Sequence, residues 1–230
     1  MVDQRSHFHS ELAALEQTLL DVADRCERMV GLAVEALTTG DTDLCEEVFV
    51  ADKAIDATYL DTHNRWLSMM ARQQPMGGDL RLMSALLHVN VTLERMGDQC
   101  VNIANLARLS AGLPARDRII EQIREMADLV RPMIRTAAEA LVRRDADEAR
   151  LLPAMDEPID RINRLMYREV VDCAPDTRML EWATHMMMAA RALERIGDQS
   201  VDIGEQVAFL VTGEFQEFSE KGFVARASAD

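Results

Sequence analysis

Carboxylates recur along this sequence at the four-residue spacing of one helical face. Glu94 and Asp98 stand in the segment LERMGDQCVNI, and Glu194 and Asp198 stand in LERIGDQSVDI, 100 residues later. Side chains four residues apart are neighbours on a helix, and two adjacent carboxylates can chelate or bridge hard metal ions, which prefer oxygen ligands. The two segments share eight of eleven residues, which predicts an internal duplication.

A second pair of carboxylates is duplicated in the same way. Asp52 and Asp56 stand in DKAID, and Asp156 and Asp160 stand in DEPID. If this helix runs antiparallel to the one that carries the first motif, four carboxylates meet in each half. Glu205 continues the acidic row in the second half. Asn102 and Asp202 lie one turn beyond Asp98 and Asp198. Together with the paired acids, the candidate metal ligands are Asp52, Asp56, Glu94, Asp98, Asn102, Asp156, Asp160, Glu194, Asp198 and Asp202.

Each of the two long motifs places a glycine inside a helical pattern, beside its acidic pair. A glycine in a helix interior costs about 1 kcal/mol relative to alanine. Two such glycines at matched positions, Gly97 and Gly197, indicate that space is needed there for a neighbouring backbone or for ions. A simpler interpretation stays open, because charged pairs on a helix are usually a solvated face. Arg95 and Arg195 could then pair with the acids beside them.

Breaks in the apolar patterning predict six helices of roughly 25 to 35 residues. The breaks fall at Gly40, at residues 74–78, 111–115, 144–145 and 174–177, and at Gly213. Asp43 with Glu46 is expected to form a capping box, and Asp79 and Asp145 to cap later helices. Pro153 and Pro158 lie inside the fifth pattern, where proline usually kinks or restarts a helix.

The third and sixth helical patterns carry the same apolar seam. Its residues alternate four and three apart, from Leu82 to Ala107 and again from Trp182 to Val207. This spacing is typical of nearly parallel helix packing, and the acidic rows lie off the seam on an outer flank. We therefore predict an all-α fold of two tandem antiparallel three-helix bundles, at residues 5–110 and 115–213, with a C-terminal tail at 214–230.

Composition excludes several classes of function. The formal net charge of −15 argues against nucleic-acid binding and against docking on anionic lipid. No apolar run is long enough to span a membrane, so no membrane insertion is expected. The four cysteines, Cys26, Cys45, Cys100 and Cys173, form no CxxC pair and are interpreted as structural thiols in a reducing compartment.

The duplicated ERMGDQ and ERIGDQ motifs, together with RQQPMGGDLRLM at residues 72–83, resemble the PhoU family over about residues 5–213. The resemblance implies a cytoplasmic negative regulator of the phosphate-starvation response. Such a protein would couple the ATPase subunit of a phosphate ABC transporter to a membrane sensor histidine kinase. It also implies a homodimer and no enzymatic activity.

The resemblance further implies metal ions, with Fe, Mn, Mg or Zn as the candidates. Family members carry them, some as multinuclear clusters, on E/DxxxD motifs. The matching pairs are Asp52 with Asp56, Glu94 with Asp98, Asp156 with Asp160, and Glu194 with Asp198. Asn102 stands where the second copy has Asp202, so the two sites are expected to differ in charge.

Two other functional classes remain as alternatives. The first is a helical di-metal carboxylate enzyme. Its usual sites need ExxH ligands that project into a bundle core, and this chain has no ExxH. The second is an acidic scaffold that binds no metal. No residue is predicted to be catalytic.

Overall fold

The computed structural model describes residues 2–218, with side chains from residue 6 onward. Its long helices are α1 (Val2–Thr39), α2 (Asp43–Gln73), α3 (Gly78–Ser110), α4 (Asp117–Arg143), α6 (Leu152–Val171) and α7 (Thr177–Thr212), and α5 (Ala146–Ala149) is a single turn. Residues 2–218 contain no strand, so the all-α prediction is confirmed. Of the predicted tail, Glu214–Phe218 are described and lack regular secondary structure, while residues 219–230 lie outside the described part.

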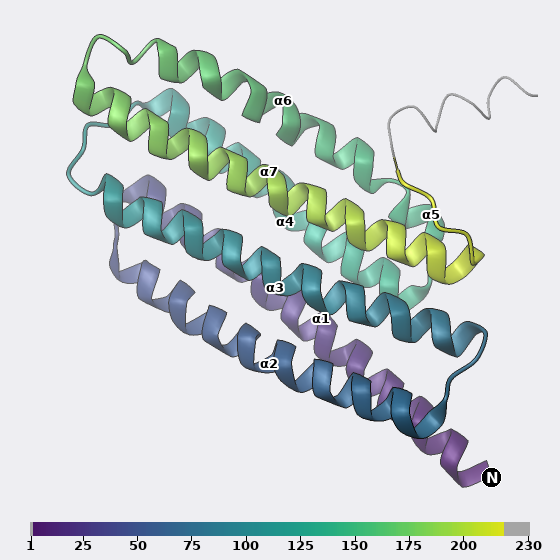
Figure 1. The fold of residues 1–230 in the computed structure, drawn as a ribbon. Helices are drawn as coiled ribbons and strands as arrows, with labels where there is room; N and C mark the ends of the chain where they lie inside the picture. Colours follow the sequence, from purple (N-terminus) through teal and green to yellow (C-terminus); the bar gives the residue numbers. More distant parts are fainter. Residues whose placement is uncertain (1, 219–230) are drawn as a thin grey trace, which may run out of the picture.

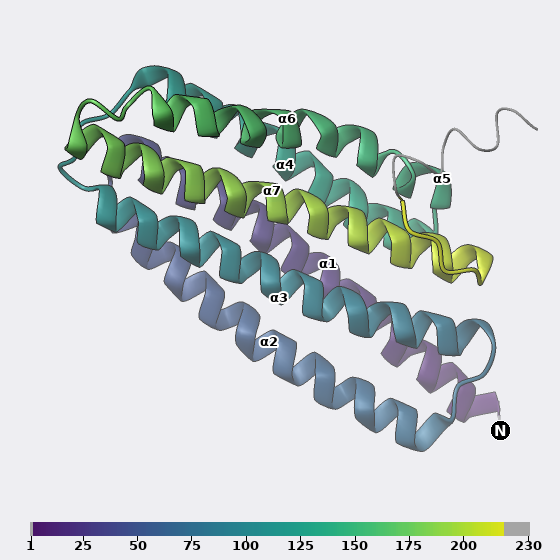
Figure 2. The same cartoon turned by 45° about the horizontal axis from the view of Figure 1, so that its top comes forward.

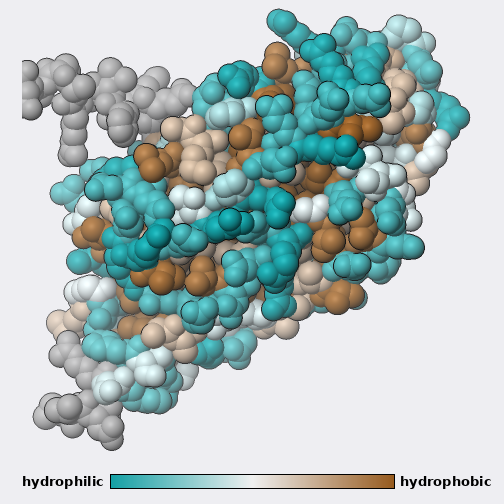
Figure 3. All heavy atoms as spheres, turned by 180° about the vertical axis from the view of Figure 1, so that it is seen from behind, coloured by the Kyte–Doolittle hydropathy of each residue, from teal (hydrophilic) through white to brown (hydrophobic). Residues whose placement is uncertain are grey.

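The helices form two three-helix bundles that pack side by side. Helices α2, α3, α7 and α6 lie next to one another in one layer, and α1 and α4 lie behind them (Figures 1 and 2). Helices α1, α2 and α3 contact one another, as do α4, α6 and α7; the halves meet where α1 packs on α4 and α3 on α7. The predicted pair of bundles is therefore confirmed. From behind, the surface is mostly hydrophilic, with apolar side chains interspersed (Figure 3).

The predicted seam forms the core of both bundles. Every seam residue of α7 from Trp182 to Val207 is buried, and in α3 only Leu82 stays partly exposed. All four cysteines are buried and free, and burial raises the pKa of the Cys26 thiol to about 12. The thiols therefore act as small hydrophobic side chains. No helix among residues 2–218 is long and apolar enough to cross a bilayer.

Two of the predicted helix caps are wrong. The Asp43 N–H donates to Asp41 Oδ1 at 3.1 Å, and the N-cap residue Thr42 makes no capping hydrogen bond with its side chain. The capping box of Asp43 with Glu46 therefore does not form. Asp43 is already the first residue of α2, and the side chain of Asp41 accepts the hydrogen bond from its N–H. Helix α3 begins after Gly77, so Asp79 lies within its first turn and does not cap it.

The fifth helical pattern is interrupted, as its prolines indicated. Asp145 caps α5 by accepting hydrogen bonds from the N–H groups of Asp147 and Glu148, which confirms this predicted cap. The chain then restarts as α6, with Pro153 in its first turn and Pro158 inside it. Helix α6 has 20 residues and is shorter than predicted. The first residues of the predicted fifth helix form the separate turn α5 instead.

An ion cluster joins the two bundles between α1 and α4. Glu27 is 8% exposed and accepts hydrogen bonds from Arg135 at 2.5 Å and from Arg131 at 3.4 Å. The Arg131 and Arg135 side chains are 40% and 56% exposed, so the mostly buried carboxylate depends on the two arginines more than they depend on it. Glu27 therefore links α1 to α4 across the boundary between the halves.

We expect Glu27→Gln to lower the free energy of unfolding, because a mostly buried carboxylate loses its charge-assisted hydrogen bonds from two arginines. Urea denaturation followed by circular dichroism measures this. The control is Glu46→Gln, which breaks an exposed pair with Arg108 and should cost less than about 0.5 kcal/mol. Equal losses in the two variants would contradict this role for Glu27.

Candidate metal sites in the two halves

The glycine of the first motif lets α2 approach α3 closely. A Cβ atom on Gly97 would stand 3.0 Å from Asp52 Oδ1 and 3.5 Å from Ile55 Cδ1. Contacts of 3.0 Å are tighter than ordinary van der Waals packing, so a side chain at this position would push the acid away. The space that Gly97 leaves is thus filled by side chains of α2, and the carboxylate of Asp52 is held against the backbone of α3.

The second half repeats this arrangement more tightly. A Cβ atom on Gly197 would overlap Asp156 Oδ1 and would stand 3.6 Å from Ile159 Cδ1. Asp156 and Ile159 occupy on α6 the places that Asp52 and Ile55 occupy on α2. Each half therefore presses one aspartate of its DxxxD pair against the glycine of its motif.

In the first half, burial and the negative charges of neighbouring carboxylates raise the pKa values of Asp52 and Glu94. The pKa of Asp52 is raised to about 6, first by burial and then by the negative charges of Asp56, Asp98 and Glu94. Burial and the charges of Asp98 and Asp56 also raise the pKa of Glu94. The four predicted acids of the first half are therefore brought together, and we call this group the first cluster. Asn102 is exposed one turn further along α3.

The second half assembles a matching group. Burial and the charges of Asp198, Asp160 and Glu194 raise the pKa of Asp156 to about 7. Burial also raises the pKa values of Glu194, Asp198 and Asp202. We call Asp156, Asp160, Glu194, Asp198 and Asp202 the second cluster. Because Asp202 stands where the first half has Asn102, the second cluster holds one more carboxylate.

Arginines distinguish the two clusters. Glu194 was expected on an outer flank, but it is only 6% exposed, and it forms an ion pair with Arg191. This expectation is wrong because Arg191, one turn before Glu194 on α7, packs over it. Val91 stands at the matching position of α3, and Glu94 stays partly exposed. Burial raises the pKa of Asp202, and the charge of Arg95, across the boundary between the halves, partly offsets this rise.

Three buried carboxylate oxygens have no hydrogen-bond donor among the described residues. They are Asp52 Oδ1, Asp156 Oδ1 and Glu194 Oε2. A buried polar atom without a partner is costly, and a bound cation would supply the missing partner. Among residues 2–218, no three Asp, Glu, His or Cys side chains converge on one point. The donor set consists of carboxylate oxygens, which suits hard cations.

The second cluster lines a pocket of about 440 Å³ between α6 and α7. Asp156, Asp160, Asp198 and Asp202 contribute to its wall, and the remaining lining residues are Pro153, Glu157, Val201 and Phe218. Sequence reasoning missed Phe218, because nothing in the C-terminal segment indicates which part of the body it contacts.

In the metal-free protein, we expect stability to fall as the pH rises from about 4 to 7. Asp52 and Asp156 have ordinary pKa values near 3.8 and folded values of about 6 and 7. The folded state therefore binds more protons than the unfolded state in this interval, and its stability decreases with pH. Urea midpoints measured with chelator at pH 5 and at pH 7.5 test this. The Asp52→Asn, Asp156→Asn double variant should lose most of the difference; an equal pH dependence would contradict the assignment.

Comparisons with known proteins match both halves. A family model described as the PhoU domain matches twice, at residues 19–107 and 123–207. The phosphate-specific transport system accessory protein PhoU homolog of Pseudomonas putida is 33% identical over 207 residues, covering 90% of this chain and 81% of that protein. The crystal structure of PhoU from Pseudomonas aeruginosa has a TM-score of 0.84 at 31% identity, over 90% of this chain and 100% of that one. The crystal structure of the phosphate transport system regulatory protein PhoU from Streptococcus pneumoniae has a TM-score of 0.82 at 26% identity, over 91% of this chain and 99% of that one.

Proposed function

We propose, because this chain belongs to the PhoU family, that it is an accessory regulator of a phosphate transport system. It acts in the cytoplasm as a homodimer and represses the phosphate-starvation response when phosphate is plentiful. It does so by contacting the ATPase subunit of the transporter and a sensor histidine kinase. Contact rather than catalysis is its mode of action, so it is not an enzyme.

We further propose that each half binds hard cations, Fe, Mn, Mg or Zn. The observation that carries this is the matched construction of the two clusters. Each has a buried aspartate oxygen that receives no hydrogen bond from the described part of the chain. In the first half the ligands are Asp52, Asp56, Glu94 and Asp98, with Asn102 beside them. In the second half they are Asp156, Asp160, Glu194, Asp198 and Asp202.

A bound cation neutralises the carboxylates and holds the two helices of each cluster together. Without it, like charges on α2 and α3, and on α6 and α7, repel one another across each helix pair. The cation therefore fixes the outer layer of helices, and with it the surface that a partner protein meets. The extra carboxylate of Asp202 compensates for the negative charge of Glu194 that Arg191 neutralises in the second cluster.

The long helices suit this function in a second way. Helices of 27 to 38 residues offer extended, rigid surfaces, and a net charge of −15 attracts basic patches on partner proteins. The alternative of a di-metal enzyme gains no support from the clusters, because they contain no histidine and lie at the edge of each bundle.

A deletion strain tests the regulatory function. In phosphate-rich medium, deletion should switch on phosphate-uptake genes, and a plasmid copy of the wild-type chain should switch them off. A copy with Asp52→Asn and Asp156→Asn is expected to repress poorly, while the Glu46→Gln copy represses normally. Unchanged expression in the deletion strain would contradict the regulatory function. Full repression by the aspartate variant would separate regulation from cation binding.

A further inference from the structure

We propose that the segment Gly213–Phe218 is a strap that closes the second cluster and makes it the tighter and more slowly exchanging of the two cation sites. This inference rests on the proposed cation binding. It adds a residue that controls access, Phe218, and a structural difference between two halves that otherwise repeat each other.

The strap begins where α7 ends. Gly213 has a φ of 78°, in the left-handed region that favours glycine, and the chain turns back there. The turn is held by Thr212 Oγ1, which accepts the Glu214 N–H at 3.1 Å. Arg81 of the first half packs against Gly213 and donates to the Leu210 carbonyl. Both halves therefore fix the direction in which the strap leaves α7.

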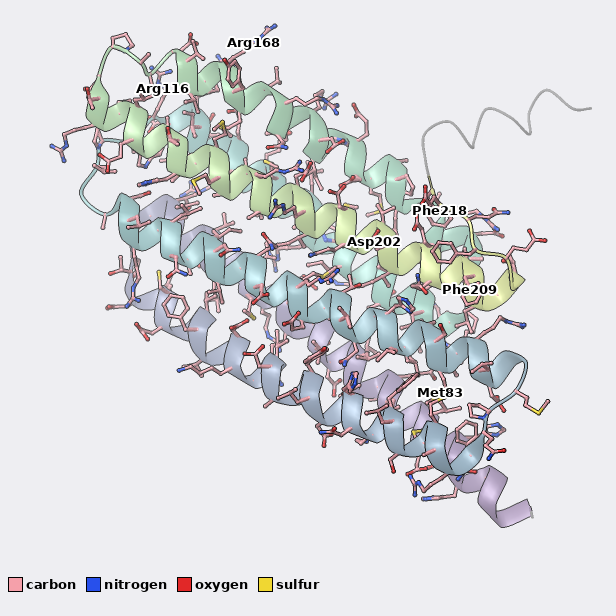
Figure 4. All side chains as sticks on the ribbon, viewed as in Figure 1. Met83, Arg116, Arg168, Asp202, Phe209 and Phe218 are labelled. Atoms are coloured by element: carbon pink, nitrogen blue, oxygen red, sulfur yellow. The ribbon has the colours of Figure 1, made fainter. Side chains whose placement is uncertain are left out.

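The strap is fastened at its far end as well. The Phe218 N–H donates to Glu205 Oε1 at 2.6 Å, one turn beyond the last acid of the second cluster. The Phe218 ring lies 3.3 Å from where a Cβ atom on Gly204 would stand. The same point lies 2.6 Å from Leu152 Cδ1 and 3.2 Å from the Ala149 carbonyl oxygen, so Gly204 makes room for the start of α6 and for the ring together. Figure 4 shows Phe218 close to α7 beyond Asp202.

The position of Phe218 gives it an effect on bound ions. Its ring forms one wall of the pocket into which Asp156, Asp198 and Asp202 also project. An apolar wall replaces water on that side, and the attraction between a cation and carboxylates is stronger where water is excluded. The ring also narrows the route by which an ion leaves. Closing the strap and binding a cation therefore favour each other, and this coupling must be reciprocal.

The first half has no counterpart to the strap. Ala104 and Asn105 stand at the positions that match Gly204 and Glu205, so the first half has no carboxylate at this position to accept a backbone N–H from a returning segment. After the helix that matches α7, the chain continues from Ala111 into α4 instead of turning back. The first cluster should therefore bind and release ions independently of the C-terminal segment.

The test uses the full-length chain with the first cluster silenced by Glu94→Gln and Asp98→Asn, titrated calorimetrically with Mn²⁺. Adding Phe218→Ala, or ending the chain after Gly213, should lower the affinity on the order of 10-fold, as expected for loss of a supporting residue around a metal. Ending the chain after Phe218 is the matched control and should leave the affinity unchanged. In the converse measurement, Mn²⁺ should slow hydrogen exchange at the Phe218 amide of this parent protein.

The outcomes separate the strap from the cation site. If the parent binds Mn²⁺ but Phe218→Ala and the Gly213 truncation bind it equally well, the strap inference is wrong and cation binding stands. If neither the wild type nor the parent binds Mn²⁺, the proposed cation binding fails, and the strap inference fails with it. A parallel set with the second cluster silenced by Asp156→Asn and Asp198→Asn should show no effect of Phe218→Ala; an equal loss there would indicate a general effect on the fold.

Discussion

Saturating Mn²⁺ is expected to raise the melting temperature of the metal-free protein by about 10 to 20 °C at pH 7.5. A ligand at 100 times its dissociation constant stabilises the folded state by about 2.7 kcal/mol per site, and two sites give about 5 kcal/mol. In a chain of this size each kcal/mol shifts the melting temperature by about 2 to 4 °C. The charges of Asp52 and Asp156, which destabilise the metal-free fold at this pH, are neutralised at the same time.

Differential scanning calorimetry measures this shift, and excess chelator should reverse it. The matched control is the Asp52→Asn, Asp156→Asn variant, which should melt at a higher temperature than the wild type without metal and respond weakly to Mn²⁺. A shift of the same size in this variant would place the bound ions elsewhere on the acidic surface.

The second large effect is expected from Gly197→Ala, which should weaken Mn²⁺ binding by the second cluster about 100-fold. The new Cβ atom would overlap Asp156 Oδ1. This oxygen lies at the end of a flexible side chain, so the carboxylate can rotate out of the site while the helix stays intact. Alanine also favours a helix by about 1 kcal/mol over glycine, so the fold should survive without loss of stability.

Two other glycine variants calibrate this prediction by titration. In Gly97→Ala the new Cβ atom would stand 3.0 Å from Asp52 Oδ1. In Gly31→Ala it would contact only the Arg131 side chain, at 3.9 Å. We expect a smaller loss of Mn²⁺ affinity at the first cluster for Gly97→Ala and no change for Gly31→Ala. If Gly197→Ala binds Mn²⁺ as the wild type does, the contact between Asp156 and Gly197 is not part of the site.

The fold was largely predictable because its determinants are local or repeated. The alternating spacing from Leu82 to Ala107 specifies which face of a helix is buried, whatever its partner is. Helix starts were less predictable because several nearby acids compete for the same N–H groups. At α2 the backbone of Thr42 is helical, with φ −75° and ψ −12°, whereas a side-chain cap usually needs an extended residue there.

The acidic pairs were predictable for the same reason, since a four-residue spacing sets neighbours within one helix. What the sequence did not predict depends on contacts between segments. The register of α6 against α7 presses Asp156 onto Gly197, Arg191 buries Glu194, and the fold of the C-terminal segment brings Phe218 to the pocket. None of these three contacts follows from the spacing of residues along the chain. The first and third join residues from different segments, and the second depends on the side-chain conformation of Arg191.

Elemental analysis tests the central claim, cation binding by two duplicated carboxylate clusters, most directly. The wild type, a first-cluster variant (Glu94→Gln, Asp98→Asn), a second-cluster variant (Asp156→Asn, Asp198→Asn) and their combination are purified without chelator, equilibrated with Mn²⁺ and separated from free ions. The account predicts that each variant loses the metal of its own half, that the combination retains none, and that circular dichroism shows all four folded. Equal metal content in the wild type and the combined variant would contradict it.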